Sequence, residues 1–143
     1  EKQFFVRTAI HLAIAFAVLI GINYFVQISA VRLQILANQA EGVSQFIQFN
    51  PVSFISAVNL LGWTVFLGLA CIFASFGMGK GRIERIAKIS FLANGLMMLF
   101  SGIAYIFSIT VVLALFMFIG LGAAIIVESI ALCVYFKQYS SVR

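Results

Sequence analysis

One carboxylate lies inside a long apolar segment of this chain. Glu128 is the only charged residue in the stretch GLGAAIIVESIALCVYF, residues 120–136. Gly120, Ala124 and Glu128 are spaced by four, so they share a helix face on which small residues allow a second helix to approach. An ionisable residue at this depth is a candidate for a structural hydrogen bond or ion pair, for a proton or cation relay, or for contact with a partner subunit or ligand.

Other polar residues are expected at a similar depth. His11 is the only histidine, and it shares a face of the first apolar segment with Arg7, while Asn94 lies in the third apolar segment. Burial of Glu128 favours its protonated form, whereas a neighbouring Arg7 or His11 favours the carboxylate. The candidate intramembrane functional residues are therefore Glu128, His11 and Asn94.

The apolar segments lack the side chains of most catalytic and metal sites. The chain has no aspartate, its two cysteines form no CxxC motif, and Glu1, Glu41 and Glu84 fall outside these segments. A catalytic triad would have only His11 and Glu128 to draw on, and magnesium or zinc sites need several clustered ligands. We therefore expect no catalytic residue, no cofactor and no metal. The enzymatic alternative is an acid–base pair of His11 and Glu128 that acts on lipid near the headgroups.

A second group of polar and aromatic side chains is expected in the opposite half of the membrane. These side chains should point into the protein, because lipid cannot satisfy an amide. One interpretation is hydrogen bonding between helices, and the functional alternative is a pocket that opens outward, with Tyr24 among its walls. The residues of this candidate outer pocket are Asn23, Gln27, Asn59, Trp63, Ser101 and Tyr105.

The distribution of charge defines the elements that position these residues. Hydrophobic residues make up 64% of the chain and charged residues 9%, whereas a soluble domain has about 25% charged residues. About 20 apolar residues in a helix cross a bilayer. The pattern predicts an all-α integral membrane bundle, a single domain of residues 1–143, with four transmembrane helices at about 8–31, 52–76, 89–108 and 112–136. The alternative that the first segment is a secretory signal is disfavoured, because its apolar run exceeds the 7–15 residues of a signal core.

The connections between the spans carry local signals. The segment RLQILANQAE keeps helical spacing and Gly42 is a typical C-cap, so the first helix should continue past the membrane and residues 32–50 should form an ordered outer cap. Asn50 and Pro51 are typical of an N-cap and of the first helical position of the second span. A tight turn is expected at residues 108–110.

Basic residues gather on one side of this topology, which predicts that both termini are cytoplasmic and that the protein lies in the plasma (inner) membrane. Arg32 alone falls on the other side. The bases of the expected cytoplasmic side are Lys2, Arg7, Lys80, Arg82, Arg85, Lys88, Lys137 and Arg143. The residues expected to contact anionic lipid headgroups are Lys80, Arg82, Arg85 and Lys88.

The segment GMGKGR, residues 77–82, resembles a glycine-rich phosphate loop only superficially, because it joins two membrane helices instead of a strand and a helix. The net charge of +5 is likewise attributed to lipid contact and not to nucleic acid.

These observations favour a small non-enzymatic multi-pass membrane protein that binds a partner protein or a lipophilic ligand in or beside the helices. The alternative is a protomer of an oligomeric transporter or channel that is coupled through Glu128. Four helices rarely enclose a full pathway, so this alternative needs a homo-oligomer or a partner subunit in the membrane.

Overall fold

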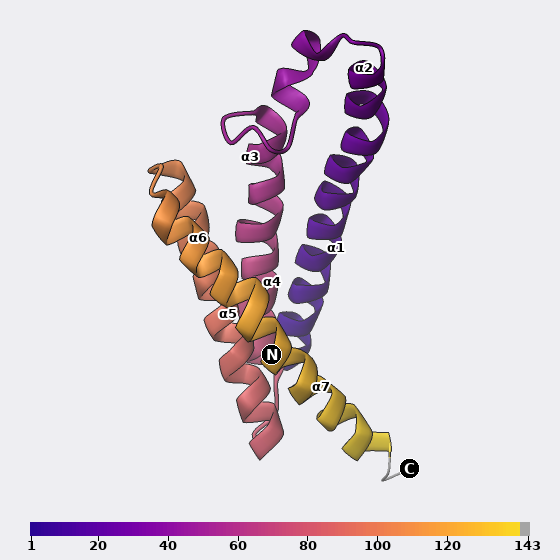
Figure 1. The fold of residues 1–143 in the computed structure, drawn as a ribbon. Coiled ribbons are helices and arrows are strands. Elements are labelled where there is room, and N and C mark those ends of the chain that lie inside the picture. The colour runs from indigo at the N-terminus through magenta and orange to yellow at the C-terminus, as the bar shows by residue number, and fades with distance from the viewer. Residues whose placement is uncertain (141–143) are drawn as a thin grey trace.

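The computed structural model describes residues 1–140, and it is all-helical (Figure 1). Four of its helices are long and apolar enough to cross a membrane, which confirms the predicted fold class. These candidate spans are Lys2–Leu36, Phe54–Gly77, Arg82–Ile106 and Thr110–Lys137. The first, third and fourth spans extend beyond the charge-free stretches that predicted them, because Lys2, Arg82 and Lys137 lie within the helical turns at their ends, whereas the second span is shifted by one or two residues.

Three of the spans are interrupted by a π-helical turn. The first span consists of α1 (Lys2–Val26), η1 (Gln27–Val31) and α2 (Arg32–Leu36). The second consists of α3 (Phe54–Leu60), η3 (Leu61–Phe66) and α4 (Leu67–Gly77). The third is the single helix α5 (Arg82–Ile106), and the fourth consists of α6 (Thr110–Phe118), η4 (Ile119–Ala124) and α7 (Ile125–Ser140). The 3₁₀ helix η2 (Ala40–Phe46) lies between the first two spans.

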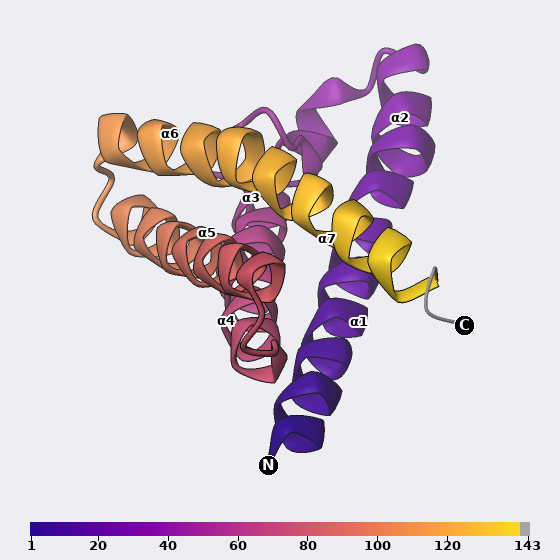
Figure 2. The ribbon, with the colours of Figure 1, turned by 90° about the horizontal axis from the view of Figure 1, so that it is seen from below.

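The four spans form an open row in chain order. Helix α1 packs against α4, α4 packs against α5, and α5 packs against α6, η4 and α7. Figures 1 and 2 show that the fourth span crosses α5 and that the C-terminal part of α7 diverges from the other helices. In the most apolar stretch of the fourth span 6% of residues are buried, against 28% in the second and third spans. The two end spans therefore turn most of their surface outward.

The connections and termini divide the molecule into two ends. The start of α1 and the end of α7 at Ser140 lie toward the end that holds the short connection at residues 78–81 (Figure 1). This end carries most of the basic residues and is called the basic end below. The opposite end, called the cap end, holds residues 37–53 and 107–109.

Glycines set the contact between the second and third spans. A Cβ atom added at Gly95 would lie 2.5 Å from the carbonyl oxygen of Gly68 and 2.6 Å from Cγ1 of Ile72. Two backbones approach this closely only where side chains are absent, as in many membrane helix pairs. The α4–α5 contact is therefore specified by small residues at its centre.

Two helices end at the cap end in the same way. Asn38 and Ser108 have positive φ angles of 55° and 57°. Behind Asn38, the Gln39 N–H donates to the carbonyl of Gln34 at 2.9 Å, and behind Ser108 the Ile109 N–H donates to the carbonyl of Ala104 at 2.8 Å. This is the Schellman arrangement, in which a left-handed residue satisfies the last carbonyls of a helix.

These endings revise one predicted boundary. The expected C-cap at Gly42 is wrong, since the helix ends at Leu36 and the left-handed residue is Asn38. Asparagine tolerates the left-handed conformation better than most residues, so the helix ends at the first residue that permits it. The turn that joins the third and fourth spans lies between Ile106 and Thr110.

The start of the second span also differs from the expectation. The N-cap is Ser53 and not Asn50, because the Ser53 Oγ accepts a hydrogen bond from the Ser56 N–H at 3.1 Å. The same hydroxyl donates to the carbonyl of Ile47 at 2.9 Å, which ties the connection that follows η2 to the start of α3. Asn50 instead closes a local turn, in which its Oδ1 accepts from the Val52 N–H at 3.3 Å.

Candidate functional site

Three amide side chains predicted for the outer pocket form a hydrogen-bond network at the cap end. Asn23 of α1 is fully buried, and its Nδ2 donates to Oδ1 of Asn59 at 3.0 Å and to Oε1 of Gln48 at 2.9 Å. Gln27 donates to the carbonyl of Phe46 at 2.7 Å and accepts from the backbone N–H of Gln48 at 3.1 Å. The network fastens the segment before α3 onto α1, so these amides form hydrogen bonds between the first span, the second span and the connection that joins them.

The other three residues predicted for this pocket lie elsewhere. Trp63 packs edge-on against Phe16 of α1, with ring centroids 4.8 Å apart. Ser101 is buried, and its Oγ donates to the carbonyl of Leu113 in α6 at 3.4 Å. Tyr105 reaches across to the connection before the second span, where its hydroxyl donates to the carbonyl of Pro51 at 2.8 Å. The structure therefore divides the six residues among three interfaces.

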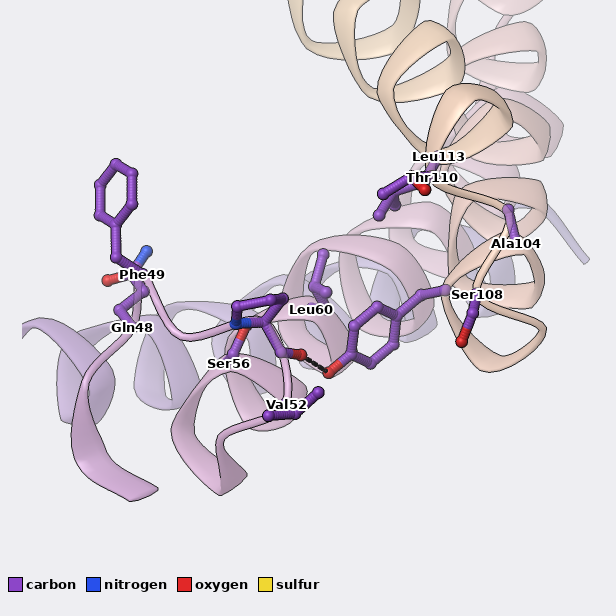
Figure 3. Close-up of a pocket in the computed structure, with 11 residues that line it drawn as sticks. Gln48, Phe49, Val52, Ser56, Leu60, Ala104, Ser108, Thr110 and Leu113 are labelled. Carbon is purple, nitrogen blue, oxygen red and sulfur yellow. Dashed lines mark hydrogen bonds between the residues drawn. The ribbon is translucent and has the colours of Figure 1, made fainter. Parts of the chain in front are cut away.

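A cavity of about 500 Å³ lies at the cap end, between the second span and the α5–α6 hairpin (Figure 3). Tyr105 belongs to its wall, and the dashed line in Figure 3 is the hydrogen bond from Tyr105 to Pro51. Sequence analysis identified only this one of the cavity residues. The complete lining is Gln48, Phe49, Pro51, Val52, Ser56, Leu60, Ala104, Tyr105, Ser108, Thr110 and Leu113.

The chemistry of this cavity is mixed. Gln48, Ser56, Ser108 and Thr110 contribute amide and hydroxyl groups, and the rest of the wall is mostly aliphatic or aromatic. Gln48 comes from the connection before α3, Ser56 from α3, Ser108 from the α5–α6 turn and Thr110 from the start of α6, so only the folded arrangement brings them together (Figure 3). No spacing within one helix would have revealed them, because each contributes from a different segment.

A second groove of about 530 Å³ runs along α3, η3 and α5. Its lining includes Leu60 and Tyr105, which also line the first cavity, so the two hollows meet at these side chains. The remaining wall is almost entirely apolar and includes Leu61 and Ile103. Together the hollows offer a polar region at the cap end and an apolar extension toward the middle of the membrane helices.

The structure brings Asn94 and Glu128 together. Both are buried, with exposed fractions of 1% and 6%. The Nδ2 of Asn94 donates to Oε2 of Glu128 at 3.3 Å and lies 3.9 Å from Sγ of Cys71 in α4. Within the described part of the chain, Oδ1 of Asn94 and Oε1 of Glu128 are buried without a hydrogen-bond partner. The fourth span meets α5 at this polar pair.

The structure does not bring His11 to this pair. His11 and Arg7 are both exposed on α1, whereas the neighbours of Glu128 belong to α5. Within residues 1–140, no hydrogen bond or ion pair joins His11 to Glu128, and no group of three His, Cys, Asp or Glu side chains is close enough to hold a metal. The position of His11 in the sequence predicts a depth in the membrane similar to that of Glu128. In the open row, however, the second and third spans separate α1 from the fourth span.

The basic residues near the 78–81 connection lie on the surface of the basic end. Lys80, Arg82 and Arg85 are exposed, and Lys88 is half-buried. The carboxylate of Glu84 lies against Gly79 and Gly81, where side chains added to the glycines would collide with it. An anion held by this glycine-rich turn would meet that carboxylate, so the turn does not resemble a phosphate-binding loop.

Comparisons with family models, curated proteins and solved structures found no match.

Proposed function

We propose that this chain is a non-enzymatic integral membrane protein that binds a lipophilic ligand with a polar head at the cap end. The observation that carries the proposal is the cavity of about 500 Å³ between the second span and the α5–α6 hairpin. Its volume falls within the range of about 300–1,000 Å³ of known small-molecule sites. Its few polar groups and mainly apolar wall are also typical of such sites.

The arrangement favours a single-chain amphiphile. A hydroxyl, carbonyl or carboxyl head would lie among Gln48, Ser56 and Thr110, which offer both hydrogen-bond donors and acceptors. An acyl or isoprenoid tail would extend past Leu60 and Tyr105 into the apolar groove of about 530 Å³. A tail in that groove stays in contact with apolar side chains and lipid hydrocarbon. Moving it from the bilayer into the groove therefore exposes no apolar surface to water.

A photoreactive fatty acid tests this proposal. The purified protein in lipid nanodiscs would be irradiated with a diazirine fatty acid, with and without excess unlabelled fatty acid, and the adducts mapped by peptide mass spectrometry. We expect competable adducts on the cavity lining. The Val52→Trp variant should reduce labelling at least several-fold, because Val52 is an exposed rim residue where an indole can fill the cavity without disturbing the core.

The matched control is Phe54→Trp, which adds an indole two residues away at an exposed position that does not line the cavity. Its labelling should equal that of the wild type. Adducts spread evenly over the lipid-facing helices, or equal labelling of the two tryptophan variants, would refute ligand binding at the cap end.

A second candidate function is that of a protomer in an oligomeric transporter or channel. The specific observation in its favour is the open row, whose fourth span is largely unburied within one chain. A second copy or a membrane partner subunit would complete an enclosed pathway. Crosslinking in native membranes would show discrete oligomers on this hypothesis, and a monomer under those conditions would contradict it.

The orientation and membrane are part of the proposal. The bases of the basic end support cytoplasmic termini in a plasma (inner) membrane, with Lys80, Arg82, Arg85 and Lys88 against anionic headgroups. Labelling of single cysteines introduced at Lys80 and Gln39 by a membrane-impermeant maleimide in intact cells distinguishes the two orientations. Only the cysteine at position 39 should react from outside.

A further inference from the structure

The buried pair of Asn94 and Glu128 has more hydrogen-bond acceptors than donors. The amide of Asn94 supplies its N–H groups to Oε2 of Glu128 and to Sγ of Cys71. Two acceptors then remain, Oδ1 of Asn94 and Oε1 of Glu128, and both are buried with no partner among the described residues. A buried acceptor without a donor is unfavourable, and a membrane interior offers no water to supply one.

We propose that Asn94 and Glu128 form a binding site for one exchangeable proton. A hydrogen on Oε1 of Glu128 donates to Oδ1 of Asn94, while Nδ2 of Asn94 continues to donate to Oε2. The two groups then make the paired hydrogen bonds of a carboxylic acid and a primary amide, and both remaining acceptors are satisfied at once. The site does not depend on a ligand at the cap end, so it goes beyond the proposed function.

The ligand is a proton and not a metal ion, because the site offers too few oxygens. Calcium takes six to eight oxygen ligands and magnesium takes six at fixed geometry. The cluster provides the oxygens of Asn94 and Glu128 and the sulfur of Cys71, and one of those oxygens is already occupied by the amide N–H.

Few other titratable or charged groups face the site. Helix α4 contributes the Cys71 thiol, and residues 110–124 of α6 and η4 contain no titratable side chain. On α5 the nearest charge toward the basic end is Lys88, about 9 Å along the axis from Asn94. On α7 the titratable groups that follow Glu128, as far as Lys137, are Cys133, Tyr135 and Lys137, about 7 to 14 Å along the axis. Water at the basic end is therefore the nearest source and sink of the proton.

Proton occupancy should govern how firmly the fourth span docks on α5. The buried residues of this span, within the part described, are Gly120, Glu128 and Ala131. Gly120 packs against Met98 and lies close to Oδ1 of Asn94. Among the buried residues that the fourth span brings to this small interface, Glu128 is the only polar side chain in the part described. With the proton bound, the interface has two paired hydrogen bonds. Without it, Oδ1 of Asn94 and Oε1 of Glu128 are both buried acceptors without a donor among the described residues.

The Glu128→Gln variant provides a permanent mimic of the protonated state. Its Nε2 can donate to Oδ1 of Asn94 and its Oε1 can accept from Nδ2, so the donor count is complete at every pH. The Asn94→Leu variant removes the partner instead and keeps the carboxyl group. Circular dichroism in nanodiscs would verify that both variants keep the helical content of the wild type.

Infrared difference spectroscopy across a pH series tests the site directly. The wild type in nanodiscs should show the carbonyl band of a hydrogen-bonded neutral acid that disappears as the pH is raised. The band should be absent in Glu128→Gln and shifted toward the free acid in Asn94→Leu. A spectrum without any acid band that depends on Glu128, or a band that Asn94→Leu leaves unchanged, would overturn the proposal.

A distance measurement tests the mechanical consequence. Spin labels at the exposed positions Ile86 and Phe136 would report the separation of α5 and α7. The background replaces the exposed Cys133 by alanine and the buried Cys71 by serine, whose hydroxyl can still accept from the Asn94 amide. The distance distribution of the otherwise wild-type protein should broaden as the pH rises, and that of Glu128→Gln should not. An identical response of the two proteins to pH would refute the coupling of the proton to docking.

Discussion

Replacing Gly95 by alanine should weaken the contact between the second and third spans. The added methyl carbon would lie 2.5 Å from the Gly68 carbonyl oxygen, 2.6 Å from Cγ1 of Ile72 and 3.0 Å from the Ile72 nitrogen. Only the second of these contacts involves a flexible side chain, so α4 and α5 must separate to accept the methyl group. Overpacking of this kind costs about 1–3 kcal/mol, and the backbone contacts place Gly95→Ala at about 2–3 kcal/mol.

Alanine also favours a helix over glycine by about 0.5–1 kcal/mol, which offsets part of this cost. Gly122→Ala isolates that second effect, because a Cβ atom at Gly122 meets nothing within 4 Å. Both glycines lie inside membrane helices, so the propensity gain is common to the two variants. The free energy of unfolding of Gly95→Ala should therefore lie about 2–3 kcal/mol below that of Gly122→Ala, which is a change of about 30- to 150-fold in the unfolding equilibrium.

Denaturation with sodium dodecyl sulfate in mixed micelles measures this difference. Far-ultraviolet circular dichroism follows the helices, and the fluorescence of Trp63, the only tryptophan, follows the packing of the second span against Phe16. The two signals should change together if unfolding is two-state. Equal stability of Gly95→Ala and Gly122→Ala would refute the argument that glycine is required for the close approach of α4 and α5.

Three further substitutions test the cap end. Asn23→Leu should destabilise the protein by about 1–2 kcal/mol and accelerate hydrogen exchange in residues 44–48, because the hydrogen bonds to Gln48 and Asn59 are lost. The control Ser29→Ala removes a hydrogen bond within its own helix and should change neither quantity. Ser53→Ala should cost about 1 kcal/mol through loss of the N-cap of α3, and mixed-micelle denaturation would show it; an unchanged midpoint contradicts the cap assignment. Ser108→Gly should stabilise the protein by about 1 kcal/mol, because glycine adopts the φ angle of 57° without strain, and a lower midpoint would argue against this turn geometry.

The sequence predicted the four spans well because their evidence is local. Long stretches without charge identify membrane helices whatever their neighbours are, and the structure has a helix over each of them. The ends of the helices were predicted less well, because several nearby residues suited each role. Asn38 and Gly42 are both suited to the left-handed position, and the structure uses Asn38. Ser53 and Asn50 are both suited to the N-cap, and the structure uses Ser53.

The candidate sites show that the contact partner of a helix face is harder to predict than the membrane-spanning helix itself. Spacing along one helix identifies which residues share a face, but it does not say which neighbour that face meets. Asn94 and Glu128 meet because the fourth span crosses α5, whereas His11 at a similar depth remains exposed on α1. The cavity at the cap end combines residues from four segments of the chain, so its polar groups had no common pattern in the sequence.

The row of helices has a consequence for the assembly of the protein during synthesis. Each span after the first packs on the span before it in the chain, so this partner is already in the membrane when the later span leaves the ribosome. Contacts between consecutive segments require only short loops to close, which keeps the entropy cost of each step small. The first two spans can therefore form their hairpin before the third emerges, and the fourth can dock last, at Asn94, without rearrangement of the earlier helices.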